Sequence, residues 1–388
     1  MPSLVRESGS LSRVNVSPAE QQANRGTKDV SVSRTGRFVA FEASASNLTE
    51  RCSFHDYTIF VKDLRTGGVH RLDLGGDTAY HEDIFDPQIS SDGSRVLYAE
   101  GNYYDGPDSY SLYDIADRAR RQVEGPAGSS VSSPFPIGDG RFIGFTATSN
   151  TKPYSRAMLW DTFRDRYIDL HRSFGRGTRR AGSALVDASA DGSLLLISAR
   201  ARDKGGAVGT GLFLLDRQSG KVRLVGVDDG KYGPQRLHLS GNGRFIVFNS
   251  KGRNWSTSDR DREWDIFLHD IRSDRTRVLS VTPEGHQISR YVAMGHGAIS
   301  HSGRYIAFSA TKLARAAKGS GASVYVYDRR TNRISVANNS YDGSDSVGSI
   351  WDVDLAARGG RAFFTSYDSN LVPGDTNLDS DVFKYSFR

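Results

Sequence analysis

The chain has 388 residues, of which 37% are hydrophobic, 25% charged and 10% aromatic, and 41 are glycine. This composition is typical of a globular protein rich in turns, and it excludes fibrous and intrinsically disordered classes. The formal net charge is +6, but basic and acidic residues alternate, as in 259–263. A nucleic-acid-binding protein would instead carry a continuous basic stripe with interleaved aromatic residues, so no nucleic-acid partner is expected.

Targeting signals are few. No apolar run approaches the roughly 18 residues of a membrane span, and the N-terminal segment lacks the apolar core of a signal peptide. The single cysteine, Cys52, excludes an intrachain disulfide and suits a reducing compartment. We therefore expect a cytoplasmic protein if Met1 is the native start, and a periplasmic or secreted one if the sequence has been trimmed.

A short polar turn that ends in glycine recurs seven times, at intervals of 47 to 60 residues. Glycine supplies the positive φ that a tight hairpin turn needs. Each turn precedes a short apolar run, such as 38–41 or 245–248, which is typical of a strand covered on both faces. The seven glycines are Gly36, Gly93, Gly140, Gly192, Gly243, Gly303 and Gly360.

Each of the first six repeats continues with a strand ending in aspartate, 21 to 27 residues after its glycine, then a turn and a fourth strand. Repeats of this length suit four-stranded blades. The sequence therefore predicts an all-β fold, a single seven-bladed β-propeller domain of four-stranded antiparallel blades. The expected blades are approximately 28–73, 86–123, 133–170, 184–225, 235–281, 297–337 and 351–388.

The seventh repeat stops before its outer strand. The N-terminal segment 11–17 can supply it, because Arg13-Val14-Asn15-Val16 resembles the outer strands that begin at Arg277 and Arg333, and Pro18 falls where Pro283 does. The first strand of the chain is thus expected to pair with the last blade. Such closure of the ring removes an exposed sheet edge, which would otherwise promote aggregation.

The repeat unit resembles that of the TolB-type, WD40-like propellers, and the copies at 89–94 and 188–193 match it best. The loop 369–377 is similar to loops of bacterial proteins of this kind. The resemblance implies the fold and a bacterial origin, but no single activity, because these propellers include scaffolds, translocation partners and enzymes. The sequence has no Gly-x-Ser-x-Gly motif and no room for a hydrolase domain, so a serine hydrolase is not expected.

The two faces of the predicted propeller differ. The turns between first and second strands and between third and fourth strands are short and share one face, here called the turn face. The other connections are long and open on the opposite face, the loop face, where a binding site is expected. The candidate ligand-binding residues at its channel mouth are Arg290, Tyr80, Asp83, Tyr232, Trp351 and Asp352. Alternatively, the aromatic members pack between blades and the others are solvated.

Histidines from two blades converge on the same mouth. His81 precedes the inner strand of blade two, while His286 and His296 flank that of blade six. Imidazole transfers protons near neutral pH, and three imidazoles can also ligate a metal. The candidate catalytic residues are His296, His81, His286 and Tyr291. His301, which lies in a short turn on the turn face, is expected to be structural.

Two acidic loops alternate oxygen-bearing side chains as calcium loops do. One carries Asp375, Asn377, Asp379 and Asp381, and 259–265 in blade five has the same spacing. Neither has the glycine at position six or the glutamate at position twelve of an EF-hand loop. Structural calcium or another divalent metal is therefore one interpretation, and capping of loop amides by the aspartates is the other.

Three functions fit these patterns. The first is a binding module that holds a small molecule, sugar or peptide at the channel mouth of the loop face. The second is a lyase or cyclase that uses His, Tyr or Asp as general acid and base, with or without a metal. The third is a scaffold for a protein partner, which would need an apolar or single-sign surface patch.

Overall fold

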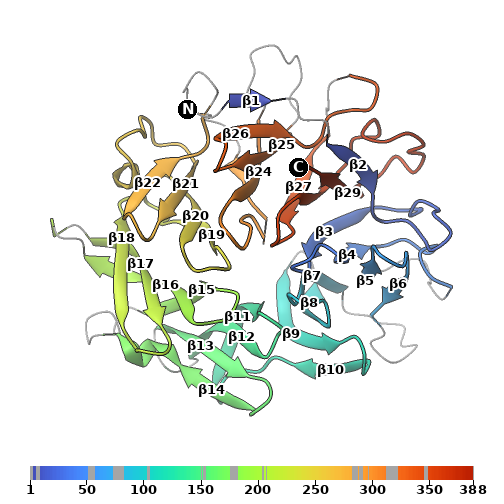
Figure 1. Cartoon of the computed structure of the whole chain (residues 1–388). Coiled ribbons are helices and arrows are strands. Elements are labelled where there is room, and N and C mark those ends of the chain that lie inside the picture. Colours follow the sequence, from blue (N-terminus) through green and yellow to red (C-terminus); the bar gives the residue numbers. More distant parts are fainter. Residues whose placement is uncertain are drawn as a thin grey trace.

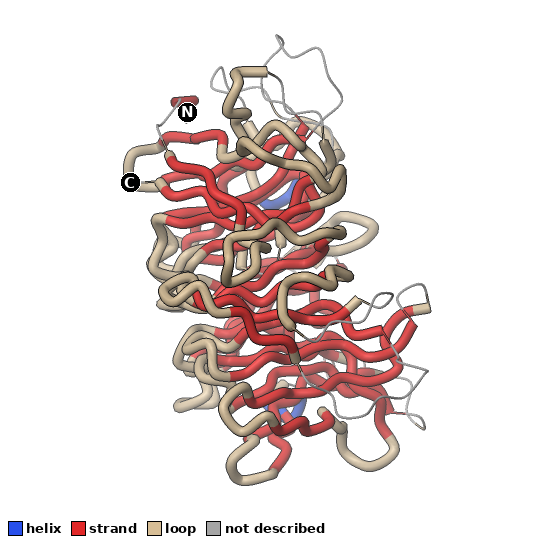
Figure 2. Tube along the Cα trace, turned by 90° about the vertical axis from the view of Figure 1, so that its right-hand side faces the viewer, coloured by secondary structure: helices blue, strands red, loops and turns tan. Residues whose placement is uncertain are grey.

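The structure, a computed structural model, describes residues 3–5, 9–50, 57–72, 83–102, 105–149, 151, 154–174, 182–202, 205–206, 208–281, 287, 292–295, 297–311, 322–344 and 348–387. In this part of the chain the strands form seven sheets, arranged as a ring around a central axis (Figure 1). Figure 2 shows the ring from the side. The predicted seven-bladed propeller is confirmed.

Within each blade the strands are antiparallel, and the first strand lies nearest the axis (Figure 1). Blades one and two are β3 (Thr27–Val32), β4 (Phe38–Ala43), β5 (Thr58–Asp63), β6 (Val69–Arg71) and β7 (Asp83–Ile89), β8 (Arg95–Asn102), β9 (Gly106–Asp114), β10 (Ala119–Gln122). Blades three and four are β11 (Ser129–Ile137), β12 (Phe142–Ser149), β13 (Ser155–Asp161), β14 (Arg166–Asp169) and β15 (Ser183–Ala188), β16 (Leu194–Arg202), β17 (Val208–Asp216), β18 (Val222–Asp228).

The remaining blades follow the same order. Blades five and six are β19 (Gln235–Leu239), β20 (Phe245–Ser250), β21 (Asp265–Asp270), β22 (Arg275–Val278) and β23 (Val292–Ala293), β24 (Tyr305–Thr311), β25 (Ala322–Asp328), β26 (Arg333–Val336). Blade seven is β27 (Ile350–Leu355), β28 (Arg361–Ser366), β29 (Asp381–Ser386) and β2 (Ser10–Arg13). Two short 3-10 helices lie in connections, η1 (Leu170–Ser173) and η2 (Arg253–Trp255). Among the described residues no helix is long and apolar enough to cross a bilayer.

The hydrophobic core lies between neighbouring blades, not inside one sheet. At one position of the second strand, six blades carry a fully buried aromatic side chain. Each packs against apolar residues of its own and the adjacent blade, so both faces of every sheet are covered. This explains the nearly continuous apolar runs of the repeat. The aromatic residues are Phe41, Tyr98, Phe145, Phe248, Phe308 and Phe364.

The seven repeat glycines all have positive φ, between +65° and +82°, as the turn prediction requires. They lie in what we call the inner turns, which connect the first and second strands: 33–37, 90–94, 138–141, 189–193, 240–244, 300–304 and 356–360. Outer turns connect the third and fourth strands. The inner and outer turns share the turn face.

Replacing Gly243 by valine is expected to destabilise the protein by about 1–3 kcal/mol. Its φ is +70°, which a β-branched residue rarely adopts, and an added Cβ would lie 2.6 Å from Leu194 Cδ1. Urea unfolding of the variant measures this loss. Gly67 provides the control, because its φ is +75° and an added Cβ would meet nothing within 4 Å. Equal losses at both positions would mean that packing against Leu194 contributes nothing.

An arginine–aspartate clamp joins the inner and outer turns of a blade. In blade one, Arg37 Nε and Nη2 donate to Asp63 Oδ1 and Oδ2 at 2.9 and 2.6 Å. These hydrogen bonds hold the pKa of Asp63 well below its usual range. The clamp explains why the repeat places arginine after its glycine and aspartate at the end of its third strand. Further copies are Arg95–Asp114, Arg141–Asp161, Arg244–Asp270 and Arg304–Asp328.

The ring closes through the N-terminal strand, as predicted. Strand β2 pairs antiparallel with β29, and Figure 1 shows the two side by side. The strand spans Ser10–Arg13, shorter than the expected 11–17, because the chain turns back when Ser17 N donates to Gln21 O. The register also differs by one residue from the sequence match: Arg13 lies opposite Phe383 as Val278 lies opposite Phe267.

A further strand, β1 (Ser3–Val5), pairs parallel with β26 on the outer edge of blade six. Blade six therefore has five strands in the described structure. The three residues of β1 carry no repeat signature, so the sequence did not predict this strand.

Candidate functional site

Six of the residues predicted at the channel mouth lie outside the described residues, and their roles stay predictions. The six are Tyr80, His81, His286, Arg290, Tyr291 and His296. Trp351 lies in β27, at the loop-face end of an inner strand.

Three other predicted ligand-binding residues are described. Tyr232 is 59% exposed, and its ring lies 6.2 Å from that of Trp264. Asp352 is buried in β27, and its carboxylate accepts a hydrogen bond of 3.2 Å from Val30 N of blade one. That bond links neighbouring blades. Asp83, at the start of β7, is half-buried at the loop-face end of blade two.

Asp83 belongs to a group of ionisable residues at the loop-face end of blades one and two, formed with Lys28, Glu42 and Tyr57. Glu42 in β4 is completely buried, and its Oε1 lies 3.8 Å from Lys28 Nζ. The same ammonium lies 3.8 Å from the centre of the Tyr57 ring. Because the Lys28 side chain is 27% exposed, the group connects a buried carboxyl with the surface.

The pKa of Glu42 is raised to about 8, mainly by burial and then by the negative charges of Asp29 and Asp83. Lys28 and the backbone N–H of Asp86 oppose this shift. Burial and then Glu42 raise the pKa of Tyr57 as well. Glu42 is therefore mostly protonated at neutral pH, where it can donate a proton or a hydrogen bond.

The sequence does contain a signal for Glu42, although Glu42 was not among the predicted site residues. It is the one acidic residue at its strand position, since the equivalent residues opposite the third strands are Ala99, Thr146, Ser198, Asn249, Ser309 and Thr365. Burying a carboxyl inside an otherwise apolar strand is costly, so its presence indicates a specific role at that position. Its raised pKa could not be predicted, because it depends on burial between two blades.

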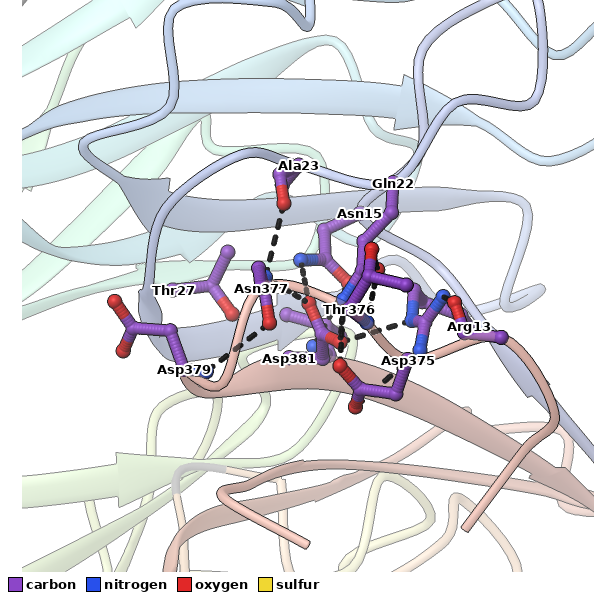
Figure 3. A network of polar contacts seen from close by, with 12 residues as sticks. Arg13, Asn15, Gln22, Ala23, Thr27, Asp375, Thr376, Asn377, Asp379 and Asp381 are labelled. Atoms are coloured by element: carbon purple, nitrogen blue, oxygen red, sulfur yellow. Dashed lines mark hydrogen bonds and ion pairs between the residues drawn. The ribbon is translucent and has the colours of Figure 1, made fainter. Parts of the chain in front are cut away.

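The predicted metal loop of blade seven forms part of the ring closure (Figure 3). Arg13 Nε lies 2.9 Å from Asp381 Oδ2 and its Nη2 lies 3.3 Å from Asp375 Oδ2. The Gln22 side-chain amide donates to both carboxylates, at 2.9 Å to Asp375 and 2.8 Å to Asp381. Asn15 donates to Asp381 at 2.6 Å. A guanidinium thus supplies the positive charge that a cation would bring.

The other two predicted ligands of this loop have different partners. Asn377 uses its amide nitrogen to donate to Ala23 O at 2.9 Å and to Asp381 at 3.3 Å. Figure 3 shows the Asp379 carboxylate turned away from Asp375 and Asp381. Asp381 and Asn377 thus have hydrogen-bond partners within the protein, and the metal assignment of this loop stays a prediction.

Blade five repeats the same loop without the guanidinium. Asp259, Asp261 and Asp265 place one carboxylate oxygen each within 4.8 Å of one another. Gln287, like Gln22, donates to two of them, at 2.9 Å to Asp259 and 2.8 Å to Asp265. The residue at the position of Arg13 is the apolar Val278. Among the described residues no cationic side chain pairs with this acidic cluster.

The missing guanidinium changes the acidity of the loop. The pKa of Asp265 is raised to about 7, mainly by burial and also by the charges of Asp259 and Asp261. In blade seven burial raises the pKa of Asp381 only to about 6, because Asn15 and Arg13 oppose the shift. The acidic cluster of blade five is therefore a place where a bound cation would relieve repulsion between buried carboxylates.

No protein-family model matches the chain, and no curated protein matches it. Solved structures do. The β-propeller domain of the Trilobed protease from Pyrococcus furiosus has a TM-score of 0.58 and 11% identity, covering 93% of this chain and 95% of that one. An oligogalacturonate lyase in complex with manganese has a TM-score of 0.57 and 12% identity, covering 100% and 97%. TolB from Acinetobacter baumannii matches at 0.45 and 16% identity, covering 77% and 63%.

At these identities the likeness shows the fold alone. The protease domain is matched over nearly its whole length, and the described blades of this chain have the same kind of architecture. The β-propeller fold that the repeat predicts is thus confirmed, and the likeness of the repeat to TolB-type, WD40-like propellers stays a resemblance.

Proposed function

We propose that the protein binds a polar small molecule, sugar or peptide at the channel mouth of the loop face, beside Lys28, Glu42, Tyr57 and Asp83. The observation that carries this proposal is the pKa of Glu42, raised to about 8 next to a partly exposed ammonium. A fully buried carboxyl costs stability, and such groups concentrate at functional sites. Lys28 offers a charge to an anionic group of the ligand, and protonated Glu42 offers a hydrogen bond.

The same observation favours the enzyme as the second candidate. In a lyase reaction on an acidic sugar, a base removes the proton beside the carboxylate, the carbon–oxygen bond breaks, and an acid protonates the leaving oxygen. Glu42 has the protonation state of that acid at neutral pH. An imidazole such as His296 is the proposed base. One structural neighbour is an oligogalacturonate lyase, which makes oligogalacturonate the first substrate to test.

Replacing Lys28 by methionine is expected to weaken binding of an acidic oligosaccharide at least tenfold, because the ammonium is lost while the aliphatic stem is kept. Calorimetric titration with oligogalacturonate, and with neutral oligosaccharides, measures the effect. Lys251→Met is the matched control: its side chain is 29% exposed, pairs with Glu263 at 3.4 Å and lies near the Trp264 ring, all in blade five. Equal affinities in both variants would contradict the site.

Glu42→Gln separates binding from catalysis, since glutamine keeps the shape and hydrogen bonding of the protonated acid but donates no proton in a reaction. A binding module is expected to keep its affinity in this variant. A lyase is expected to keep its affinity and to lose at least a hundredfold in turnover. Turnover is measured by the ultraviolet absorbance of the new carbon–carbon double bond. If neither binding nor turnover changes in Lys28→Met and Glu42→Gln, both candidate functions at this site fail.

We further infer that the acidic cluster of blade five, Asp259, Asp261 and Asp265, holds a hard divalent cation such as calcium or manganese. The comparison within the chain supports it, because blade seven neutralises the equivalent carboxylates with Arg13 and blade five has Val278 there. Carboxylate oxygens are the ligands that such cations prefer. The cation would fix the loop between β20 and β21. It is a structural role, at a distance from the chemistry proposed for Glu42.

A further inference from the structure

The turn face carries a cavity on the propeller axis. Its volume is about 170 Å³, and every blade contributes an inner-turn residue to its wall. The ionisable side chains that line it are Arg34 of blade one, Asp187 of blade four, His238 of blade five and His301 of blade six. The cavity lies at the end of the channel opposite to the loop-face group around Glu42.

Backbone hydrogen bonds between neighbouring inner turns hold the rim of this cavity. Arg34 N donates to Ser91 O at 2.9 Å, and Arg358 N donates to Arg34 O at 3.1 Å. His301 N donates to Ala357 O at 2.6 Å. These hydrogen bonds link the inner turns of blades six, seven and one in series. They hold in place the backbone that carries the rim side chains.

The rim is positively charged. The seven inner turns, together with the strand residue that directly follows each, contain eight arginines and three aspartates. Five of the arginines belong to the clamps with third-strand aspartates described above. Arg361 donates to the carbonyls of Thr35 and Gly36 at 3.4 and 3.3 Å. Arg34 and Arg358 are exposed, and no carboxylate among the described residues forms an ion pair with either. Arg34 lines the cavity, and Arg358 directly follows the lining residue Ala357.

His301 lies next to this positive region and lines the cavity. Its imidazole packs on the inner turn of blade five, where an added Cβ on Gly241 would collide with Nδ1. That nitrogen is buried and has no hydrogen-bond partner among the described residues. Burial and then Arg34 lower the pKa of His301, while Asp191 opposes the shift. The imidazole is therefore neutral at pH 7, and an anion that offset the charge of Arg34 would raise its pKa.

In the deeper wall, the carboxylate of Asp187 already has hydrogen-bond donors within the protein. Asp187 Oδ2 accepts from Leu239 N at 2.6 Å, and Oδ1 accepts from Ala188 N at 2.7 Å. His238 Nδ1 lies 3.9 Å from the same carboxylate. An anion is thus favoured at the rim, near Arg34 and His301, and is repelled from the depth of the cavity by Asp187.

We propose that this cavity binds a compact oxyanion, a carboxylate or phosphate group, between Arg34, Arg358 and His301. The group can belong to a free small anion or to an acidic side chain of a peptide that reaches the axis from the turn face. Two guanidinium groups and an imidazole with an open nitrogen match its acceptor oxygens. His301, expected from the sequence to be structural, is on this proposal a ligand-binding residue.

Calorimetric titration of the whole chain with inorganic phosphate, with succinate and with a glutamate-rich peptide tests the proposal. Arg34→Gln and Arg358→Gln are each expected to weaken binding at least tenfold. Arg330→Gln is the matched control, because Arg330 is also an exposed arginine on the turn face but lies in an outer turn. Melting temperatures verify that the variants fold.

His301 is tested separately by Gly241→Ala, which displaces the imidazole without removing a charge, and by pH. Binding is expected to tighten as pH falls below neutrality, since the anion raises the pKa of His301, and this dependence should vanish in His301→Gln. Phosphate or succinate binding identifies a free anion as the source, and binding of the peptide alone identifies a protein segment. No binding by any of the three, or equal losses in Arg34→Gln and Arg330→Gln, would overturn the proposal. Neither result touches the proposed function, which rests on the other face.

Discussion

Replacing Arg13 by glutamine is expected to destabilise the propeller by about 3–5 kcal/mol at pH 8, because the variant leaves the buried carboxylates of Asp381 and Asp375 without their guanidinium. Burial already raises the pKa of Asp381 to about 6, and Arg13 opposes that rise. Without Arg13 this pKa rises further, so the variant recovers stability when acidification protonates Asp381. The loss is therefore expected to be smaller at pH 5 than at pH 8.

Urea unfolding at both pH values measures these differences. Arg65→Gln, at an exposed outer turn of blade one, is the control and is expected to change stability by less than about 0.5 kcal/mol. The double variant Arg13→Gln/Asp381→Asn is expected to regain much of the loss. Deleting residues 1–17 removes β2 altogether, exposes the edge of β29 and is expected to cause aggregation. A deleted chain with an unchanged melting temperature and no aggregates would contradict closure by this strand.

Replacing Asp265 by asparagine is expected to stabilise the cation-free protein at pH 8 by up to about 4 kcal/mol. Its pKa is about 7 when folded and 3.8 in the unfolded chain. The folded state therefore binds this proton more tightly than the unfolded chain does. The stability that the bound proton contributes is fully present below about pH 4 and is lost as the pH rises through 7. Asparagine carries no charge and removes this loss.

The same variant tests the cation. Calcium or manganese is expected to raise the melting temperature of the unmodified chain at pH 8, because the ion binds only the folded loop. Asp265→Asn should abolish that response. Asp381→Asn, at the equivalent position in blade seven, should retain it. Glu42 also has a raised pKa, so the pH dependence is compared between chains that differ only at residue 265. A cation response that survives Asp265→Asn would place the ion elsewhere.

The repeat allowed the ring to be predicted because the physical requirements of a blade are local. Gly243 is needed for positive φ at one residue, and the runs after each glycine are apolar because both sheet faces are covered. The N-terminal strand was found for the same reason. The predicted register was one residue off, because the match paired Arg13 with Arg277 by residue type. In the structure Arg13 takes the position of Val278. A shift of one residue moves every side chain to the other face, so the Arg13–Asp381 pair could not be anticipated.

The candidate sites were harder to predict because they depend on contacts between blades. Glu42 owes its raised pKa to burial against blade two and to the charges of Asp29 and Asp83. His301 was judged from its place in a short turn, whereas its importance comes from packing over Gly241 and from the charge of Arg34. The acidic loops were recognised by spacing, but the spacing alone could not distinguish the loop with Arg13 from the loop with Val278.

The pairing of β2 with β29 has a consequence for biosynthesis. Residues 10–13 are synthesised long before residues 381–386, so the nascent propeller cannot complete blade seven until β29 has been translated. Blades one to six can assemble vectorially, each on its predecessor. Until β29 is available, Arg13 and Asn15 lack their partner Asp381, and β2 must be kept from pairing with other strand edges. We therefore expect the demand for chaperones to be concentrated on the segment around β2 until residues 381–386 have been synthesised.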